Sequence, residues 1–474
     1  MARKKLTNLL LYRRRVVLAY IFIFCALILL LTVGLSIPGG LTSAEEASSV
    51  TSVHLHSVTI NLPYYLLQKA SISLLGLSVL SIKLPSIVLA FISGAGIFFL
   101  LKRWLSLAIS VFASLIIFAS TTFLSLAGTG TPAIMYELFP VLLLLFGTRV
   151  LAHDRGIIIY SVLLLMTIAA ALLTPTMIYL VLLALGLVLF NPHVRYGFRR
   201  LPVIGLLPLI CGFIITAAPL AYMAVGNPDS LRQIFAIPSS LSGIIENGRV
   251  LISLFGNFIH PGIAAGILSP IIGLATAGLA LLGLYRIARG IYTARAQFIV
   301  GWSFIALILA IINPGYGILL YLPLVLLSSI GLGQLASIWY RTFPLNPYAR
   351  VSALVPISIL IIGIVCGSSL RYVNSTLYAT GSAALYSHDF QLIQDYLTRE
   401  KPTNVTLAVA SADVGFYENL HNSSLKHVLA IESLNTTHIG GTIIASGPIA
   451  ISSDPIRILT DSRANSADRF YVYQ

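Results

Sequence analysis

Two adjacent carboxylates, Glu45 and Glu46, follow a long apolar run in the segment GGLTSAEEASS. Two acids side by side at a membrane surface can supply a general base, because crowding raises the pKa of one of them. The same letters also fit the first turn of a helix, in which Thr42 or Ser43 is the N-cap and the helix dipole favours the acids. The local spacing leaves both interpretations open.

Three cations stand near the same predicted membrane face as this acidic pair. Lys83 opens an apolar run in SIKLPSIVL, and Arg232 and Arg249 flank the segment QIFAIPSSLSGIIENG. Cations at this depth suit the phosphate or pyrophosphate of a lipid headgroup. The alternative for each is snorkelling to ordinary anionic lipid.

Glu137 is a carboxylate inside an apolar run, in TGTPAIMYELFP. Thr131 can cap a helix here and Pro132 suits its first turn, which places Glu137 about 7–8 Å into the span. A carboxylate close to lipid is costly and is therefore a candidate functional group. The alternative is a carboxylate that is hydrogen-bonded between helices.

Aromatic and histidine side chains add further candidates on this face. Tyr64 and Tyr65 in NLPYYLLQ fit the wall of a sugar pocket, although tyrosines also anchor helices at the membrane interface. His260 in FIHPG is another candidate for the pocket. His54 and His56 share one face of an extended segment but lack a third ligand nearby, so no metal site is predicted.

The composition indicates what must position these groups. Of the 474 residues, 57% are hydrophobic and 9% are charged, and the mean hydropathy is +0.94. Soluble domains carry about 25% charged residues. Barrel strands would alternate rather than run apolar for about 20 residues. The chain is therefore predicted to be an α-helical polytopic membrane protein.

The net charge of +14 reflects topology and predicts no nucleic-acid partner, because 18 of the 29 lysines and arginines lie in six short segments between apolar runs. Eleven transmembrane helices are expected, with the N-terminus in the cytoplasm and the last residues outside. This pattern suits a bacterial plasma membrane. The apolar runs cover about residues 16–37, 84–101, 104–127, 132–151, 156–173, 174–190, 201–223, 263–284, 298–312, 316–339 and 351–370.

Residues 1–370 are predicted to form the membrane domain, with outer segments at 38–83 and 224–262. The second of these segments reads as short amphipathic pieces along the interface. Residues 371–474 differ in character, since they hold nine of the fifteen acids. A helix near 388–399 and strands near 405–410, 442–446 and 470–473 predict a small extracytoplasmic α/β domain.

The order of the motifs resembles that of the C-type glycosyltransferases, which use polyprenyl-phosphate sugars and include protein O-mannosyltransferases and lipid A aminoarabinose transferases. The family has an acidic pair after the first helix, an amphipathic P-P-L-Y-Y helix, R-L-P-S at the second span and A-R-x-G-T-P-D at the fourth. The matching segments here are TSAEEASS, NLPYYLLQ, KLPS and SLAGTGTPAIMYE. The likeness is closest over about residues 15–150 and mainly architectural as far as 370.

The resemblance implies sugar transfer at the outer face, with inversion, from a polyprenyl-phosphate sugar to an acceptor hydroxyl whose nature stays open. Glu45, with Glu46 as second choice, would be the general base, and Lys83 with Arg232 or Arg249 would hold the phosphate without a metal or other cofactor. The family's arginine falls at Gly128 and its fourth-span acid at Ala133, one helical turn before Glu137.

Two other classes of function remain alternatives. A transporter or flippase for a lipid-linked or anionic solute would show repeated halves and ionisable groups at the midplane. A non-catalytic membrane scaffold that displays the C-terminal domain would tolerate loss of Glu45 and Lys83 with no effect beyond stability. The first alternative is disfavoured because no internal repeat is evident.

Overall fold

The computed structural model describes most of the chain. The described residues are 2–37, 39–55, 59–152, 156–199, 228–238, 243–258, 262–342, 354–378, 385–400, 405–409, 413–418, 428–431, 442–447, 454–460 and 469–473, with a few isolated positions between them.

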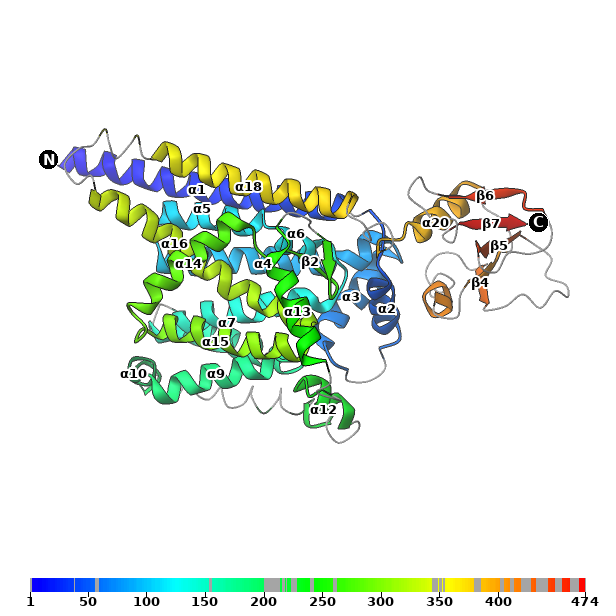
Figure 1. The fold of residues 1–474 in the computed structure, drawn as a ribbon, viewed down its shortest axis with the longest axis horizontal. Helices are drawn as coiled ribbons and strands as arrows, with labels where there is room; N and C mark the ends of the chain where they lie inside the picture. The colour runs from blue at the N-terminus through cyan, green and yellow to red at the C-terminus, as the bar shows by residue number, and fades with distance from the viewer. Residues whose placement is uncertain are drawn as a thin grey trace.

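Long apolar helices form the body of the molecule (Figure 1). Within the described residues, six helices are long and apolar enough to cross a membrane, or seven if one bent pair is counted as a span, and three shorter apolar helices lie beside them. The chain is therefore a multi-pass membrane protein. The helices of the body are α1 (Ala2–Ser36), α4 (Val79–Trp104), α5 (Leu107–Phe118), α6 (Thr121–Gly128), α7 (Met135–Leu151), α8 (Ile157–Leu172), α9 (Met177–Phe190), α14 (Leu274–Ala288), α15 (Ala294–Ile312), α16 (Tyr321–Thr342) and α18 (Leu354–Leu377).

The prediction of eleven spans is met only in part. The run at 201–223 lies almost wholly outside the described residues, so the total stays a prediction. The run at 104–127 is not one helix, because α5 and α6 meet at a bend of 60°, where the Ser120 hydroxyl accepts the backbone N–H of Phe123 in α6. The run at 263–284 begins as a hairpin of β1 (Gly262–Ala264) and β2 (Ile267–Ser269), and helix starts only at Leu274.

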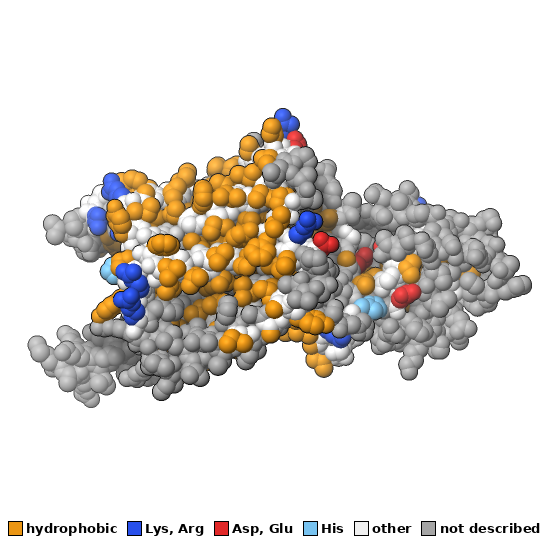
Figure 2. Space-filling view, turned by 90° about the horizontal axis from the view of Figure 1, so that it is seen from below, with side chains coloured by type: hydrophobic (Ala, Val, Ile, Leu, Met, Phe, Trp, Pro, Cys, Tyr) orange, Lys and Arg blue, Asp and Glu red, His pale blue; other side chains and the backbone are white. Residues whose placement is uncertain are grey.

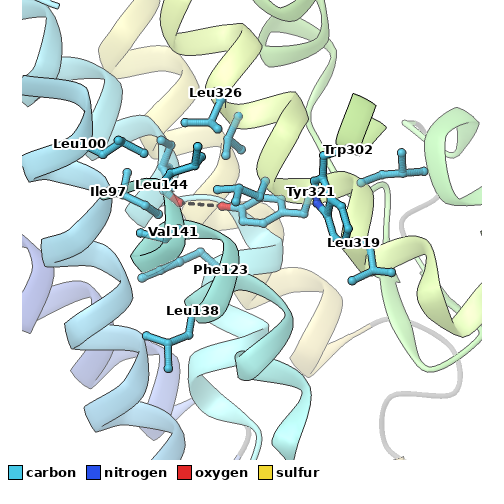
Figure 3. Close-up of a cluster of buried hydrophobic side chains, with 14 of the residues drawn as sticks. Ile97, Leu100, Phe123, Leu138, Val141, Leu144, Trp302, Leu319, Tyr321 and Leu326 are labelled. Carbon is cyan, nitrogen blue, oxygen red and sulfur yellow. Dashed lines mark hydrogen bonds between the residues drawn. The ribbon is translucent and has the colours of Figure 1, made fainter. Parts of the chain in front are cut away.

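Short 3₁₀ segments precede two of the long helices, at Pro132–Ile134 before α7 and at Pro314–Leu320 before α16. Proline suits these positions because it lacks the N–H that the first helical turn leaves unpaired. A buried apolar cluster joins the helices, and Figure 3 shows Trp302 and Tyr321 inside it. The Tyr321 hydroxyl is hydrogen-bonded to the Ser120 hydroxyl at 2.6 Å, which ties α16 to the bend between α5 and α6.

Two helices, α2 (Ser43–Val53) and α3 (Leu62–Leu75), lie at one end of the body, and the N-terminus of α1 lies at the other (Figure 1). We call these the α2 end and the basic end, because Figure 2 shows Lys and Arg side chains at the latter. The last turns of α4 and α14 carry Lys102, Arg103 and Arg286. Figure 2 shows hydrophobic side chains covering the body between the two ends. The predicted outer segment at 224–262 contains α12 (Pro228–Ile234) and α13 (Ile244–Gly256), and α10 (Pro192–Arg199) lies at the basic end.

The C-terminal residues form a mixed five-stranded sheet in the order β4-β3-β5-β7-β6. β3 is parallel to β4 and β5, whereas β7 is antiparallel to β5 and β6. Helix α20 (Asp389–Glu400) buries Phe390, Ile393 and Leu397 against it. The predicted helix and three of the strands are present, and β4 and β6 are additional. The strands are β3 (Val405–Ala408), β4 (Val428–Ile431), β5 (Thr442–Ser446), β6 (Arg457–Leu459) and β7 (Phe470–Tyr473).

Candidate active site

Glu45 closes the first turn of α2. Thr42 is the N-cap, its hydroxyl accepts the Glu45 backbone N–H, and the Thr42 N–H donates to Glu45 Oε2 at 2.7 Å. This reciprocal capping box satisfies two backbone donors that a helix start otherwise leaves free. The interpretation of T-S-A-E as a helix start, with Thr42 as its cap, is therefore confirmed.

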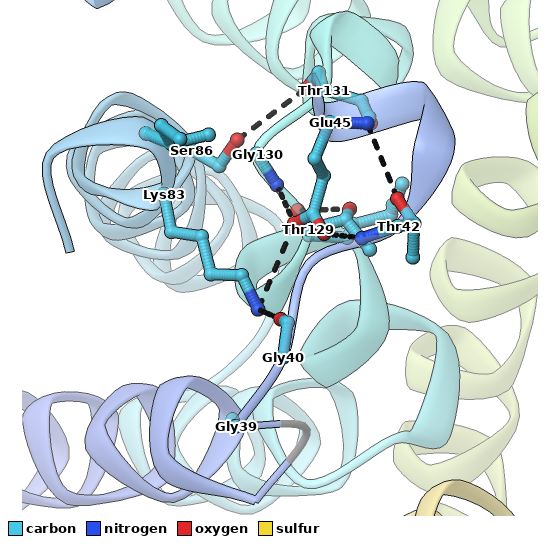
Figure 4. Close-up of polar contacts among 12 residues, drawn as sticks. Gly39, Gly40, Thr42, Glu45, Lys83, Ser86, Thr129, Gly130 and Thr131 are labelled. Atoms are coloured by element: carbon cyan, nitrogen blue, oxygen red, sulfur yellow. Dashed lines mark hydrogen bonds and ion pairs between the residues drawn. The ribbon is translucent and has the colours of Figure 1, made fainter. Parts of the chain in front are cut away.

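The same carboxylate forms a buried ion pair with Lys83 on α4 (Figure 4). Glu45 Oε1 lies 3.7 Å from Lys83 Nζ and accepts the Gly130 N–H, and both side chains are 0% exposed. Lys83 Nζ also donates to the Gly40 carbonyl oxygen at 2.6 Å. The structure thus brings together two residues that are predicted to act on different parts of a substrate, and in this conformation each is engaged by the other.

A polar network supports the pair from α3. The Ser48 hydroxyl donates to Gln68 Oε1 at 2.9 Å, and Gln68 Nε2 donates to the Gly130 carbonyl oxygen at 3.2 Å. The hydroxyl of Tyr64 is hydrogen-bonded to Ser86 on α4 at 2.9 Å, and Tyr64 is fully buried. Tyr64 therefore holds α3 against α4.

A cavity of about 280 Å³ opens beside this network at the α2 end. Its walls come from the start of α2, from α6 and the loop after it, from the β1–β2 hairpin and from the segment before α20. Hydroxyl groups contribute the polar part of the described lining, and none of the described lining residues carries a charged side chain. The hydroxyl-bearing residues are Thr42, Ser43, Thr122, Ser125, Thr129, Thr131, Tyr136 and Tyr386.

Glu45 lies directly behind one wall of this cavity. Its carboxylate is bonded to the backbones of Thr42 and Gly130, while Thr42, Thr129 and Thr131 line the cavity. Lys83 also lies near the wall, since its Nζ lies 5.9 Å from the ring centroid of the cavity-lining Tyr386. The ion pair thus lies next to residues that line the cavity.

Tyr386 belongs to residues 385–391, a segment that we call the strap. Leu385 and Tyr386 of the strap line the cavity. Leu41 and Ser387 form a backbone bridge, and Gln391 Nε2 donates to the Gly39 carbonyl oxygen at 2.6 Å. The contact is close, because a Cβ added at Gly40 would lie 2.3 Å from the Ser387 carbonyl oxygen. Burial raises the pKa of the Tyr386 phenol, and the nearby Glu45 raises it further, so this hydroxyl stays neutral.

Glu46 points to a different environment from that of Glu45. Its carboxyl is partly buried near Asp413 and Asp389 of the C-terminal region. Burial first, and then the charges of Asp413, Asp389 and Glu45, raise the pKa of Glu46 to about 7. A carboxyl group with this pKa is suited to exchange protons near neutrality.

Glu137 lies in the first turn of α7, is 2% exposed, and has no hydrogen-bond partner for either carboxyl oxygen among the described residues. The predicted alternative, a carboxylate hydrogen-bonded between helices, is therefore wrong for this conformation. Tyr136, its neighbour, lines the cavity, but Glu137 and Tyr65 do not.

The two predicted phosphate-binding arginines are compensated locally. Arg232 lies 3.9 Å from Asp229 and Arg249 lies 3.1 Å from Glu246, each pair being exposed and within one helix. Neither arginine lines the cavity. His260 lies outside the described residues.

Position 128 has no room for a side chain. A Cβ added at Gly128 would lie 2.5 Å from the Gly34 carbonyl oxygen and 3.0 Å from the Tyr372 hydroxyl, which itself donates to Gly34 at 2.8 Å. The arginine that the family resemblance aligns here is excluded by the packing of α1, α6 and α18. Ala133, by contrast, lines the cavity.

Sequence reasoning missed three parts of this site: Gly130, Gln68 and Tyr386. The T-G-T-P letters mark a turn at Gly130, where a Cβ would lie 2.9 Å from the Ile82 carbonyl oxygen, and this signal was available. No local sequence signal marks Gln68 in YYLLQ, because its hydrogen-bond partners come from other segments of the chain. Tyr386 is more than 300 residues distant from Lys83 along the chain, and no local pattern joins them.

Comparison with solved structures identifies the fold. No family model and no curated protein matches the chain. ArnT from Cupriavidus metallidurans bound to undecaprenyl phosphate is similar over 96% of this chain and 97% of its own, with a TM-score of 0.58 and 15% identity. ArnT from the same organism in the apo state is similar over 96% of this chain and 98% of its own, with a TM-score of 0.58 and 14% identity.

The oligosaccharyltransferase of Archaeoglobus fulgidus in its apo form is similar over 90% of this chain and 69% of its own, with a TM-score of 0.48 and 10% identity. The chain is therefore similar in fold to ArnT. The predicted resemblance to the aminoarabinose transferases is thus confirmed as a likeness in fold.

Proposed function

We propose that the protein is a membrane glycosyltransferase that moves a sugar from a polyprenyl-phosphate donor to an acceptor hydroxyl. The observation that carries this proposal is the likeness in fold to ArnT, a protein with bound undecaprenyl phosphate, over 96% of the chain. A cavity at the α2 end, next to a buried carboxylate and a buried lysine, agrees with it. The site would face the outside of the membrane.

In this mechanism the acceptor hydroxyl oxygen attacks the anomeric carbon, and the bond from that carbon to the phosphate oxygen breaks. Glu45 takes the hydroxyl proton, and the configuration at the anomeric carbon inverts. Lys83 neutralises the polyprenyl phosphate that leaves. Because Glu45 and Lys83 pair with each other in this conformation, the donor phosphate must take the place of Glu45 beside Lys83.

This exchange gives each residue its role in turn. Phosphate competes with the Glu45 carboxylate for the ammonium group and frees the carboxylate to accept a proton. Glu45 is hydrogen-bonded to Thr42, which lines the cavity, and to Gly130, which lies between the cavity-lining Thr129 and Thr131. We therefore expect the start of α2 to move when the donor binds. Glu46, with a pKa of about 7, is the second choice for the base.

The described lining also favours one class of sugar. Its polar groups are hydroxyls, which donate to and accept from sugar hydroxyls, and Tyr136 and Tyr386 add aromatic faces. A charged amino sugar or uronic acid would find no opposite charge in this lining. The expected glycosyl group is therefore uncharged.

The test is donor turnover by the full-length protein in detergent or vesicles, with a panel of polyprenyl-phosphate sugars that includes neutral and charged glycosyl groups. Wild type should release polyprenyl phosphate from a neutral donor, and Glu45→Gln should lower the rate by about 10²–10⁴-fold. Glu246→Gln, an exposed acid on α13, is the matched control and should retain the rate. Folded wild-type protein that consumes no donor would contradict the proposal.

A non-catalytic scaffold remains the second candidate, and one observation favours it. No described residue that lines the cavity carries a carboxylate, and Glu45 is fully engaged. This candidate predicts that folded Glu45→Gln behaves as wild type in every assay except unfolding.

A further inference from the structure

A second cavity lies at the basic end of the bundle, where the proposed transfer site does not reach. Its volume is about 520 Å³, and α7, α8, α9, α10 and α15 enclose it. The lining includes Trp104 and Leu151, the last residues of α4 and α7, and Ala294, the first residue of α15. These helix ends lie at the opposite end of the body from α2 (Figure 1).

Apart from Arg295 at the rim, the described lining offers water few hydrogen-bond partners. Leucine, isoleucine, valine, alanine and phenylalanine side chains make up most of it, and the Thr148 hydroxyl already donates to the Leu145 carbonyl oxygen at 2.9 Å. A buried water needs two to four polar partners. An empty void of this size forfeits the dispersion contacts of all its walls. An apolar chain is the occupant that matches, and the bilayer supplies such chains.

The rim of the cavity carries positive charge. Arg295 belongs to the lining, is exposed, and forms no ion pair among the described residues. Helix α10 contributes the buried Val194 to the wall and exposes Arg195 and Arg199 beside it, with no acid in its sequence. Cations at the membrane surface attract anionic headgroups.

We propose that this cavity is a binding site for an anionic phospholipid of the leaflet at the basic end. One acyl chain fills the space between α7, α9 and α15, and Arg295 holds the phosphate. The site is separate from the proposed donor site, which lies at the α2 end, so the two proposals stand or fall independently.

Two substitutions test the two halves of the site. A Cβ added at Gly147, which lines the cavity, meets no atom within 4 Å, so Gly147→Leu should place its side chain in the space of the acyl chain. Arg295→Glu reverses the charge at the rim. The matched controls are Gly278→Leu on α14, where a Cβ also meets no atom within 4 Å and which does not line this cavity, and Arg286→Glu, exposed at the same end.

The measurement is phospholipid retained by the full-length protein after incubation with vesicles of phosphatidylglycerol or of phosphatidylcholine, read by native mass spectrometry. Wild type should keep one phosphatidylglycerol in preference to phosphatidylcholine. Gly147→Leu should lower retention of phosphatidylglycerol about tenfold, and Arg295→Glu should abolish the preference, about fivefold for one charge. Both controls should behave as wild type.

If Gly147→Leu retains as much phosphatidylglycerol as wild type, the cavity does not bind the acyl chain. If Arg295→Glu keeps the preference for phosphatidylglycerol, Arg295 does not bind the headgroup. Thermal unfolding establishes that each variant is folded. If Gly147→Leu fails to fold, Ala184→Leu, a smaller intrusion from α9 into the same cavity, takes its place with the same expected loss.

Discussion

Glu45 Oε1 on α2 lies 3.7 Å from Lys83 Nζ on α4, and neither side chain is exposed. Removing one member of such a pair leaves an unpaired buried charge, which costs about 3–5 kcal/mol. Glu45→Gln and Lys83→Met should therefore each lower the free energy of unfolding by about that amount.

The double variant Glu45→Gln/Lys83→Met should cost clearly less than the sum of the single changes, because no charge is left unpaired. Chemical unfolding of all four proteins in one detergent measures the coupling. Additive losses would mean that the two groups do not interact, and the 3.7 Å contact would then have no energetic role.

Gly128 should tolerate no side chain. Gly128→Ala places a Cβ 2.5 Å from the Gly34 carbonyl oxygen, and we expect a loss of about 1–3 kcal/mol from overpacking. Gly278→Ala on α14, where a Cβ meets no atom within 4 Å, is the control and should gain helix propensity. An equal melting temperature for Gly128→Ala and wild type would refute the close packing of α1 and α6.

Glu46 should make stability fall as the pH rises. Its pKa is raised from 4.5 to about 7 in the folded protein, so between these values the folded state binds more protons than the unfolded state, and ionisation destabilises the fold. The penalty is absent below about pH 4.5 and complete above about pH 7. Allowing for partial exposure, it amounts to on the order of 2 kcal/mol.

Glu46→Gln removes this dependence. Its melting temperature should exceed that of wild type at pH 8, and the two should converge at about pH 4. Asp395→Asn, an exposed acid on α20, should leave the wild-type profile unchanged. Parallel profiles for wild type and Glu46→Gln would show that Glu46 titrates normally.

Glu137 offers a test of function against structure. Both carboxyl oxygens are buried without a partner among the described residues, and such burial costs about 1–3 kcal/mol. Glu137→Leu should therefore raise the melting temperature, whereas Glu246→Leu on the exposed face of α13 should not. If Glu137→Leu is folded but loses donor turnover, the carboxylate is functional in spite of its cost.

Local patterns in the sequence predicted much of this arrangement. Apolar runs indicated most helices, the T-S-A-E letters indicated the cap at Thr42, and the order of motifs indicated the fold. A run of apolar letters does not reveal a break, so the bend before Thr121 and the hairpin at 262–269 were missed. The Ser120 cap of α6 and the β1–β2 pairing both lie inside runs that are apolar in the sequence.

The site itself depends on contacts between distant segments. Lys83 was predicted to bind phosphate because it is a cation near the membrane face. Its pairing with Glu45 follows only from the contact between α2 and α4 in the folded protein. The strap that brings Tyr386 over Lys83 is fixed by Gly39, Gly40 and Leu41. Glycines are the only trace of such close backbone packing in the sequence. A glycine can occur for many other reasons, so it does not predict the contact.

The exchange of Lys83 from Glu45 to the donor phosphate is the central claim, and binding of polyprenyl phosphate without a sugar tests it most directly. Affinity would be measured for wild type, Lys83→Met and Glu45→Gln at a temperature at which all three are folded. Lys83→Met should bind about tenfold more weakly, and Glu45→Gln should bind more tightly than wild type, because no carboxylate competes for the lysine. Equal affinities in all three proteins would contradict the exchange and leave Glu45 and Lys83 a structural pair.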